Sequence, residues 1–185
     1  IGSEVTKNAV TSLAVAFIAL AAYISFRFEY KIAISALVSI LHDLIMVLGF
    51  FSFFHLEIDA SFLAAILTVV GYSMNEAVVI FDRVRENTRT HRRTDSYEKL
   101  AHDSIAQSIH RSIYTLTTVL FACGALHFFG GDSTKNFSLV MLIGFISGAY
   151  SSICVDTSLW VVWKNHTSHK RGPHAVEAEP AETEE

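Results

Sequence analysis

Residues 60–83 read ASFLAAILTVVGYSMNEAVVIFDR, and this stretch decides which kind of fold the chain can adopt. A hydrocarbon core about 30 Å thick needs about 20 apolar residues in a helix that rises about 1.5 Å per residue. The segment from Ala60 to Phe81 meets this length with one ionisable residue, Glu76, before the charged pair Asp82 and Arg83. The stretch therefore predicts a membrane-crossing helix with an acidic group inside it.

Four more segments are long and apolar enough to form such helices. Of the 185 residues 51% are hydrophobic and 17% are charged, and the charges gather between the apolar stretches. A bilayer imposes this segregation, whereas a soluble domain has no need for uninterrupted apolar runs. We therefore predict an all-α membrane protein, a bundle of about five transmembrane helices within residues 1–165. The predicted spans are residues 10–26, 32–54, 60–81, 113–129 and 137–163.

The basic residues predict the orientation of these spans. They gather at Arg27 and Lys31, in the long loop 83–111, and after Lys164. Connections rich in Lys and Arg stay in the cytoplasm, whereas the two opposite connections have no basic excess. We therefore expect residue 1 to be extracytoplasmic and the C-terminus to be cytoplasmic. A chain that starts outside has been delivered there, so we expect a preceding helix and an extracytoplasmic segment to be missing.

Two segments outside the spans have their own patterns. Within the loop 83–111, apolar residues from Tyr97 onward recur at three- and four-residue steps and predict an amphipathic helix. This helix either lies at the membrane interface or packs on the cytoplasmic ends of its own bundle. Asp95 with Glu98 resembles a capping box at its start. Residues 166–185 are rich in Glu, Ala and Pro, and we expect a disordered acidic tail.

Ionisable side chains inside a span are costly in lipid and are functional candidates for that reason. Asp43 lies midway along the second span, Glu76 lies in the third, and Arg111 stands at the start of the fourth. Asp43 could accept a proton, or it could be a structural residue bonded to a neighbouring helix. Arg111 could extend to lipid head groups or pair with an acidic group inside the bundle, and antiparallel packing could bring it to Glu76.

Residues around Glu76 support a polar helix face. Asp82 and Arg83, at the cytoplasmic boundary, favour an anchoring charge cluster over a proton pathway. Asp156 lies near the cytoplasmic end of the fifth span, where we expect local solvation. Small or polar residues, typical of a packed or water-lined face, are Gly71, Ser73 and Asn75.

The sequence patterns typical of other classes of function are absent from the chain. The chain has no phosphate-binding Gly-rich loop, no H-E-x-x-H and no G-x-S-x-G. His42 and Asp43 are adjacent on a helix and point in different directions, which argues against a metal site. No basic tract of the nucleic-acid-binding type is present. We therefore expect no enzyme, no cofactor, no metal and no nucleic-acid partner.

The run Gly71–Asn87, GYSMNEAVVIFDRVREN, closely resembles the signature of the SecF branch of the SecD/SecF protein-export family. This resemblance covers about residues 9–163. One departure is Asn75-Glu76-Ala77, where the family usually reads Asn-Asp-Thr or Asn-Asp-Ser. A second is Asp156-Thr157, where small residues or Pro are frequent. Further stretches that agree are FRFE at 26–29, LHD at 41–43, QSIHRS at 107–112, FGG at 129–131, LIG at 142–144 and YSS at 150–152.

The resemblance implies the six-helix half of a transporter of the resistance-nodulation-division (RND) superfamily, here without its first helix and extracytoplasmic domain. It also implies that the protein works in the bacterial inner membrane with a SecD-like subunit. The pair would use the proton-motive force to pull unfolded secretory proteins out of the SecYEG channel.

In that family, intramembrane acidic residues and an arginine are linked to proton passage. The resemblance implies the same role for Asp43, Glu76 and Arg111 here. Two alternatives are a half-transporter for lipids or small molecules and a purely structural accessory subunit of the translocon. The residues that would form the supporting motif are Gly71, Tyr72, Ser73, Asn75, Asp82 and Arg83.

Overall fold

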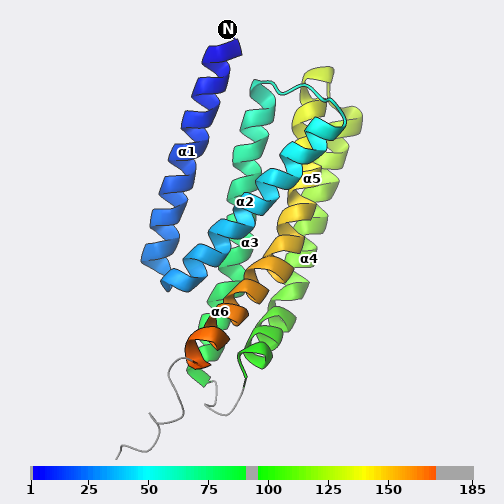
Figure 1. The fold of residues 1–185 in the computed structure, drawn as a ribbon. Coiled ribbons are helices and arrows are strands. Elements are labelled where there is room, and N and C mark those ends of the chain that lie inside the picture. The colour runs from blue at the N-terminus through cyan, green and yellow to red at the C-terminus, as the bar shows by residue number, and fades with distance from the viewer. Residues whose placement is uncertain (1, 91–95, 170–185) are drawn as a thin grey trace, which may run out of the picture.

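The computed structural model describes residues 2–90 and 96–169, and all regular secondary structure in these two ranges is helical (Figure 1). Five helical stretches there are long and apolar enough to cross a membrane, which confirms the predicted fold class. The backbone stays helical through the π-helical segment η1, so α5, η1 and α6 form one continuous span. The elements are α1 (Gly2–Arg27), α2 (Tyr30–Phe53), α3 (Ala60–Thr90), α4 (Tyr97–Phe129), α5 (Asp132–Ser151), η1 (Ser152–Asp156) and α6 (Thr157–His169).

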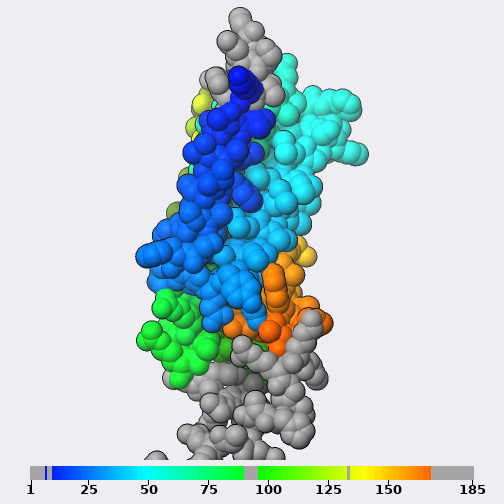
Figure 2. All heavy atoms as spheres, turned by 60° about the vertical axis from the view of Figure 1, so that its left-hand side comes forward, coloured from blue at the N-terminus to red at the C-terminus, as the bar shows by residue number. Residues whose placement is uncertain are grey.

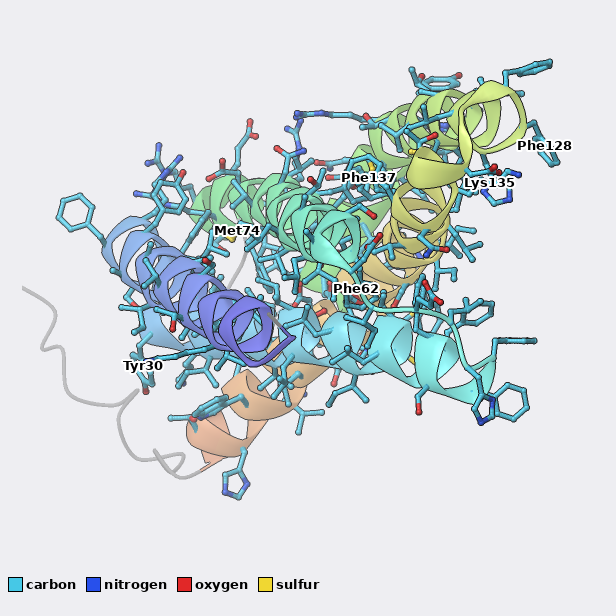
Figure 3. The ribbon with its side chains drawn as sticks, turned by 90° about the horizontal axis from the view of Figure 1, so that it is seen from above. Tyr30, Phe62, Met74, Phe128, Lys135 and Phe137 are labelled. Atoms are coloured by element: carbon cyan, nitrogen blue, oxygen red, sulfur yellow. The ribbon has the colours of Figure 1, made fainter. Side chains whose placement is uncertain are left out.

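Helix α5 packs against α2, α3 and α4, and apolar side chains fill the space between these helices. Helix α1 leans away from the others in Figure 1 and covers one face of the molecule in Figure 2. Seen from above in Figure 3, Phe62 lies among the helices, where it is 1% exposed, whereas Phe128 points outward and is 81% exposed. Apolar side chains exposed in this way can contact lipid, because a bilayer does not penalise them.

Two glycines set the close approach of α3 and α5. A Cβ atom at Gly144 would overlap the side chain of Val69, and one at Gly148 would lie 3.3 Å from Cβ of Ser73. The spacing of four residues places both glycines on one face of α5, where small residues allow two helices to pack closely. This contact brings the polar residues of α3 and α5 near α2.

The loop predicted at residues 83–111 is shorter in the structure, because the helices on both sides extend into it. Helix α3 continues past the predicted end at residue 81 to Thr90, over a polar stretch without Gly or Pro to stop it. The predicted amphipathic helix is the first part of α4, and its residues Leu100 and Ala101 are buried. It therefore packs on its own bundle, the second of the two expected arrangements.

The structure corrects two end assignments. Ser96 caps α4 by accepting a hydrogen bond from the backbone N–H of Lys99, whereas Asp95, the predicted cap, lies outside the described residues. Helix α6 continues to His169, so residues 166–169 of the predicted tail are helical. Residues 170–185 lie outside the described part of the chain.

Candidate functional site

Asp43 lies at the junction of α2, α3 and α5, and only 1% of it is exposed. Three serine hydroxyls donate hydrogen bonds to its carboxylate. Ser73 of α3 donates at 2.5 Å, and Ser147 and Ser151 of α5 donate at 2.8 Å each. We call these three residues the serine cage. Distances of 2.5–2.8 Å are typical of hydroxyl groups that bind a charged acceptor.

The local sequence explains how the cage forms. Ser147 and Ser151 are four residues apart and therefore lie on one face of α5. Gly148 lies between them and permits the close approach of Ser73. A hydroxyl can donate to a carboxylate, and it can also turn and accept from a neutral carboxylic acid. The same cage can therefore hold Asp43 with or without a proton.

Glu76 is also buried, at 3% exposure, but it does not meet Arg111. Arg111 is exposed and lines a cavity of about 370 Å³ together with Asn75 and Asp82. Adjacent residues of a helix point about 100° apart, so Asn75 faces this cavity while Glu76 faces the bundle. In the described part of the chain no ion pair joins Glu76 to Arg111, which corrects the predicted pairing. Their roles in proton passage stay predictions.

The boundary charges of α3 form ion pairs at the edge of the bundle. The carboxylate of Asp82 accepts a hydrogen bond from the guanidinium of Arg27 at 3.1 Å, and the guanidinium of Arg83 donates one to the carboxylate of Glu86 at 2.7 Å. All four side chains are at least 40% exposed. This arrangement fits the predicted anchoring cluster. A Cβ atom at Gly71 would meet nothing within 4 Å, so Gly71 does not set a close helix contact within residues 2–90 and 96–169.

Sequence reasoning missed Asp156, which we expected to be solvated. It lies on η1 and is 1% exposed, and within the described residues neither of its carboxylate oxygens has a hydrogen-bond partner. Asp43 acts on it electrostatically, and Ser39 lies nearby without the geometry of a hydrogen bond. Asp156 lies seven residues before Trp163, the end of the predicted span, which is about 10 Å along a helix. The rule that an ionisable side chain inside a span is a functional candidate identified Asp43 and would have identified Asp156 too.

Residues 1–166 match the family model described as "Protein export membrane protein SecD/SecF, C-terminal". The chain belongs to the SecD/SecF family. The protein translocase subunit SecF of Alicyclobacillus acidocaldarius is 40% identical over 180 residues, which cover 95% of this chain and 58% of that protein. The protein translocase subunit SecDF of Bacillus subtilis is 41% identical over 173 residues, which cover 92% of this chain and 23% of that protein.

Solved SecDF structures share the fold of this SecD/SecF chain. The crystal structure of SecDF in a super-membrane-facing form superposes with a TM-score of 0.86 at 36% identity. SecDF from Thermus thermophilus, a translocon-associated membrane protein, gives 0.85 at 38% identity. The matches cover 92% and 89% of this chain, and 23% of each SecDF chain. The chain is thus a multi-pass membrane protein that spans only part of the relatives it matches.

The described residues contain no group of three or more His, Cys, Asp and Glu side chains that could hold a metal ion. His42 lies beside the site, with Nδ1 3.4 Å from Oδ1 of Asp43, and 36% of its side chain is exposed. The acidic groups of this SecD/SecF site therefore have hydroxyl groups and one imidazole as neighbours. Such an arrangement can bind and release protons.

Proposed function

We propose that this SecD/SecF chain is the membrane part of a subunit that couples proton passage to protein export through SecYEG. The subunit acts on unfolded secretory proteins in the bacterial inner membrane, together with a SecD-like partner. Residue 1 lies outside the cytoplasm and the C-terminus lies inside it.

The buried Asp43 in its serine cage carries this proposal. A carboxylate inside a membrane helix is costly. In the described residues its hydrogen-bond partners are the three serine hydroxyls at 2.5–2.8 Å and the His42 imidazole at 3.4 Å. The relatives are named protein translocase subunits SecF and SecDF, so protein export is the process to which we propose that proton binding is coupled.

Protonation of Asp43 would change how three helices hold together. The anion accepts hydrogen bonds from Ser73 on α3 and from Ser147 and Ser151 on α5. A neutral acid forms weaker hydrogen bonds, because charge-assisted bonds are about twice as strong as neutral ones. Each proton therefore loosens the contacts of α2 with α3 and α5, and each release restores them. This alternation is the mechanical step that we propose for export.

The proposed assembly also contains a SecD-like subunit and the translocon. The SecDF relatives have both names in one protein, and this chain matches only 23% of the Bacillus subtilis protein. Glu76, buried on α3, and Arg111, at the cavity beside Asn75, would serve as further stations on the proton path. Co-purification of the full-length protein with a SecD-like chain and SecYEG from native membranes tests this assembly.

The decisive experiment measures uptake of a secretory protein by membrane vesicles that contain the full-length subunit and SecYEG. We expect Asp43→Asn to remove the stimulation of export by a proton gradient while the complex still assembles. Asp132→Asn is the matched control, because Asp132 is 95% exposed and forms an ion pair with Lys135, three positions later in the first turn of α5.

Two results would favour the alternatives. Export at the normal rate in Asp43→Asn, with the gradient still required, would support a purely structural subunit. Efflux of a lipid or small molecule without SecYEG would support a half-transporter.

A further inference from the structure

Asp156 is a second fully buried acid that the proposed mechanism does not use. It is 1% exposed, and both of its carboxylate oxygens lack a hydrogen-bond donor. An ionised carboxylate without donors is strongly disfavoured in an apolar interior, whereas the neutral acid is tolerated. The geometry of Asp156 therefore suits the protonated form.

Asp43 is the acidic neighbour of Asp156. The π-helical segment η1 contacts α2 and directly follows Ser151, which donates to Asp43. The charge of Asp43 acts on Asp156, and the titratable imidazole of His42 lies 3.4 Å from the carboxylate of Asp43. Two buried like charges in a medium of low dielectric constant repel each other, so we expect the two acids together to carry at most one negative charge.

The surroundings decide which of the two acids is ionised. Asp43 accepts hydrogen bonds from three serines, whereas Asp156 accepts none in the described residues. Hydrogen bonds to the charged form favour that form. The negative charge therefore resides on Asp43 and the proton on Asp156.

The π-helical turn places Asp156 in this position. Thr157 donates its hydroxyl hydrogen to the carbonyl of Ser152, five residues earlier, and this bond fits the wider turn. Single π-helical turns inside α-helices are frequent at functional sites because they turn one side chain toward a partner. Here the turn begins directly after Ser151 of the serine cage and ends at Asp156.

We propose that Asp156 is a proton-binding site that forms a coupled pair with Asp43, and that the pair holds one shared proton. The inference rests on the proposed function and adds a residue to its proton site. When a second proton arrives from the water-accessible side, Asp43 becomes neutral and the serine cage loosens. When that proton leaves, Asp43 regains the single negative charge of the pair and the hydrogen bonds of the serine cage strengthen again.

Infrared spectroscopy of the full-length protein in lipid bilayers tests the pair, because a protonated carboxylic acid has its own C=O stretching band. We expect such a band at neutral pH in the wild type, its loss in Asp156→Asn, and no change in Asp132→Asn. In Asp43→Asn, which leaves Asp156 in place, the band should disappear at a lower pH because the repelling charge is gone.

Two results would overturn the pair. One is a neutral-pH band that persists unchanged in Asp156→Asn. The other is a band that titrates at the same pH in Asp43→Asn as in the wild type. The spectra do not depend on export, so a failure here leaves the export result with Asp43→Asn standing, and a failure of export leaves the spectra standing.

Discussion

Acidic side chains have opposite surroundings in the interior of the bundle and at its charged edge, where α1, α3 and α6 end. At the edge, Asp82 pairs with Arg27 at 3.1 Å and Glu29 pairs with Lys164 at 2.7 Å, and both acids are more than 40% exposed. In the interior, Asp43 is 1% exposed and accepts hydrogen bonds from serine hydroxyls, with the His42 imidazole 3.4 Å away. A proton that binds at the edge must first displace a cation, whereas one that binds in the interior only turns hydroxyl groups. The interior is therefore suited to proton exchange and the edge to anchoring.

The largest difference between the two regions should appear when a donor to Asp43 is removed. Ser147→Ala leaves the buried carboxylate with one hydrogen bond fewer, and we expect a loss of about 1.5–3 kcal/mol in the free energy of unfolding. Ser152→Ala is the matched control, because this buried hydroxyl donates to the carbonyl of Gly148 on its own helix. Unfolding of the full-length protein in mixed micelles measures both. Equal losses in the two variants would mean that the cage does not stabilise the bundle.

At the edge we expect a smaller effect. Asp82→Asn removes an ion pair between two side chains that are 42% and 40% exposed, and such pairs contribute about 0.2–1 kcal/mol. Salt screens exposed charges, so the difference from the wild type should shrink further as the ionic strength rises. The same unfolding measurement, repeated at low and high salt, checks this. A loss as large as that of Ser147→Ala would remove the contrast between edge and interior.

The smallest effect concerns Asp59, at the start of α3. Its carboxylate accepts hydrogen bonds from the Ser61 hydroxyl and the Phe62 backbone N–H, and these bonds hold the pKa of Asp59 below its ordinary value. A lowered pKa means that this cap stabilises the helix at neutral pH and is lost as the pH falls through the folded-state pKa.

The amide chemical shift of Phe62, followed against pH by NMR, reports this titration directly. We expect a midpoint below about 3.9, the value for an unperturbed Asp. Asp59→Asn should keep the cap and abolish the pH dependence, because Asn caps helices without a titrating group. A midpoint above that of a free Asp would contradict the assignment.

The sequence predicted the features that follow from one helix at a time. The five spans, and Asp43 and Glu76 as buried acids, follow from apolar length and from the rarity of charge in a bilayer. The ion pair of Asp82 with Arg27 was not predicted, but the boundary role of Asp82 was.

Features that depend on two or more helices could not be read from the sequence. The serine cage requires the angle at which α5 crosses α2 and α3, and periodicity within one helix does not determine that angle. The predicted pairing of Glu76 with Arg111 failed for the same reason, since Glu76 turned out to face the bundle. The π-helical turn that buries Asp156 adds one residue to a helical turn, and no composition rule indicates it.

Proton flux through the full-length protein in liposomes tests the contrast between interior and edge most directly. A pH-sensitive dye inside the liposomes would report flux after a pH jump in the wild type, Asp43→Asn and Asp82→Asn. The account predicts that Asp43→Asn abolishes the protein-dependent flux and that Asp82→Asn retains it. Flux that survives in Asp43→Asn and disappears in Asp82→Asn would contradict it, because the proton would then pass through the edge.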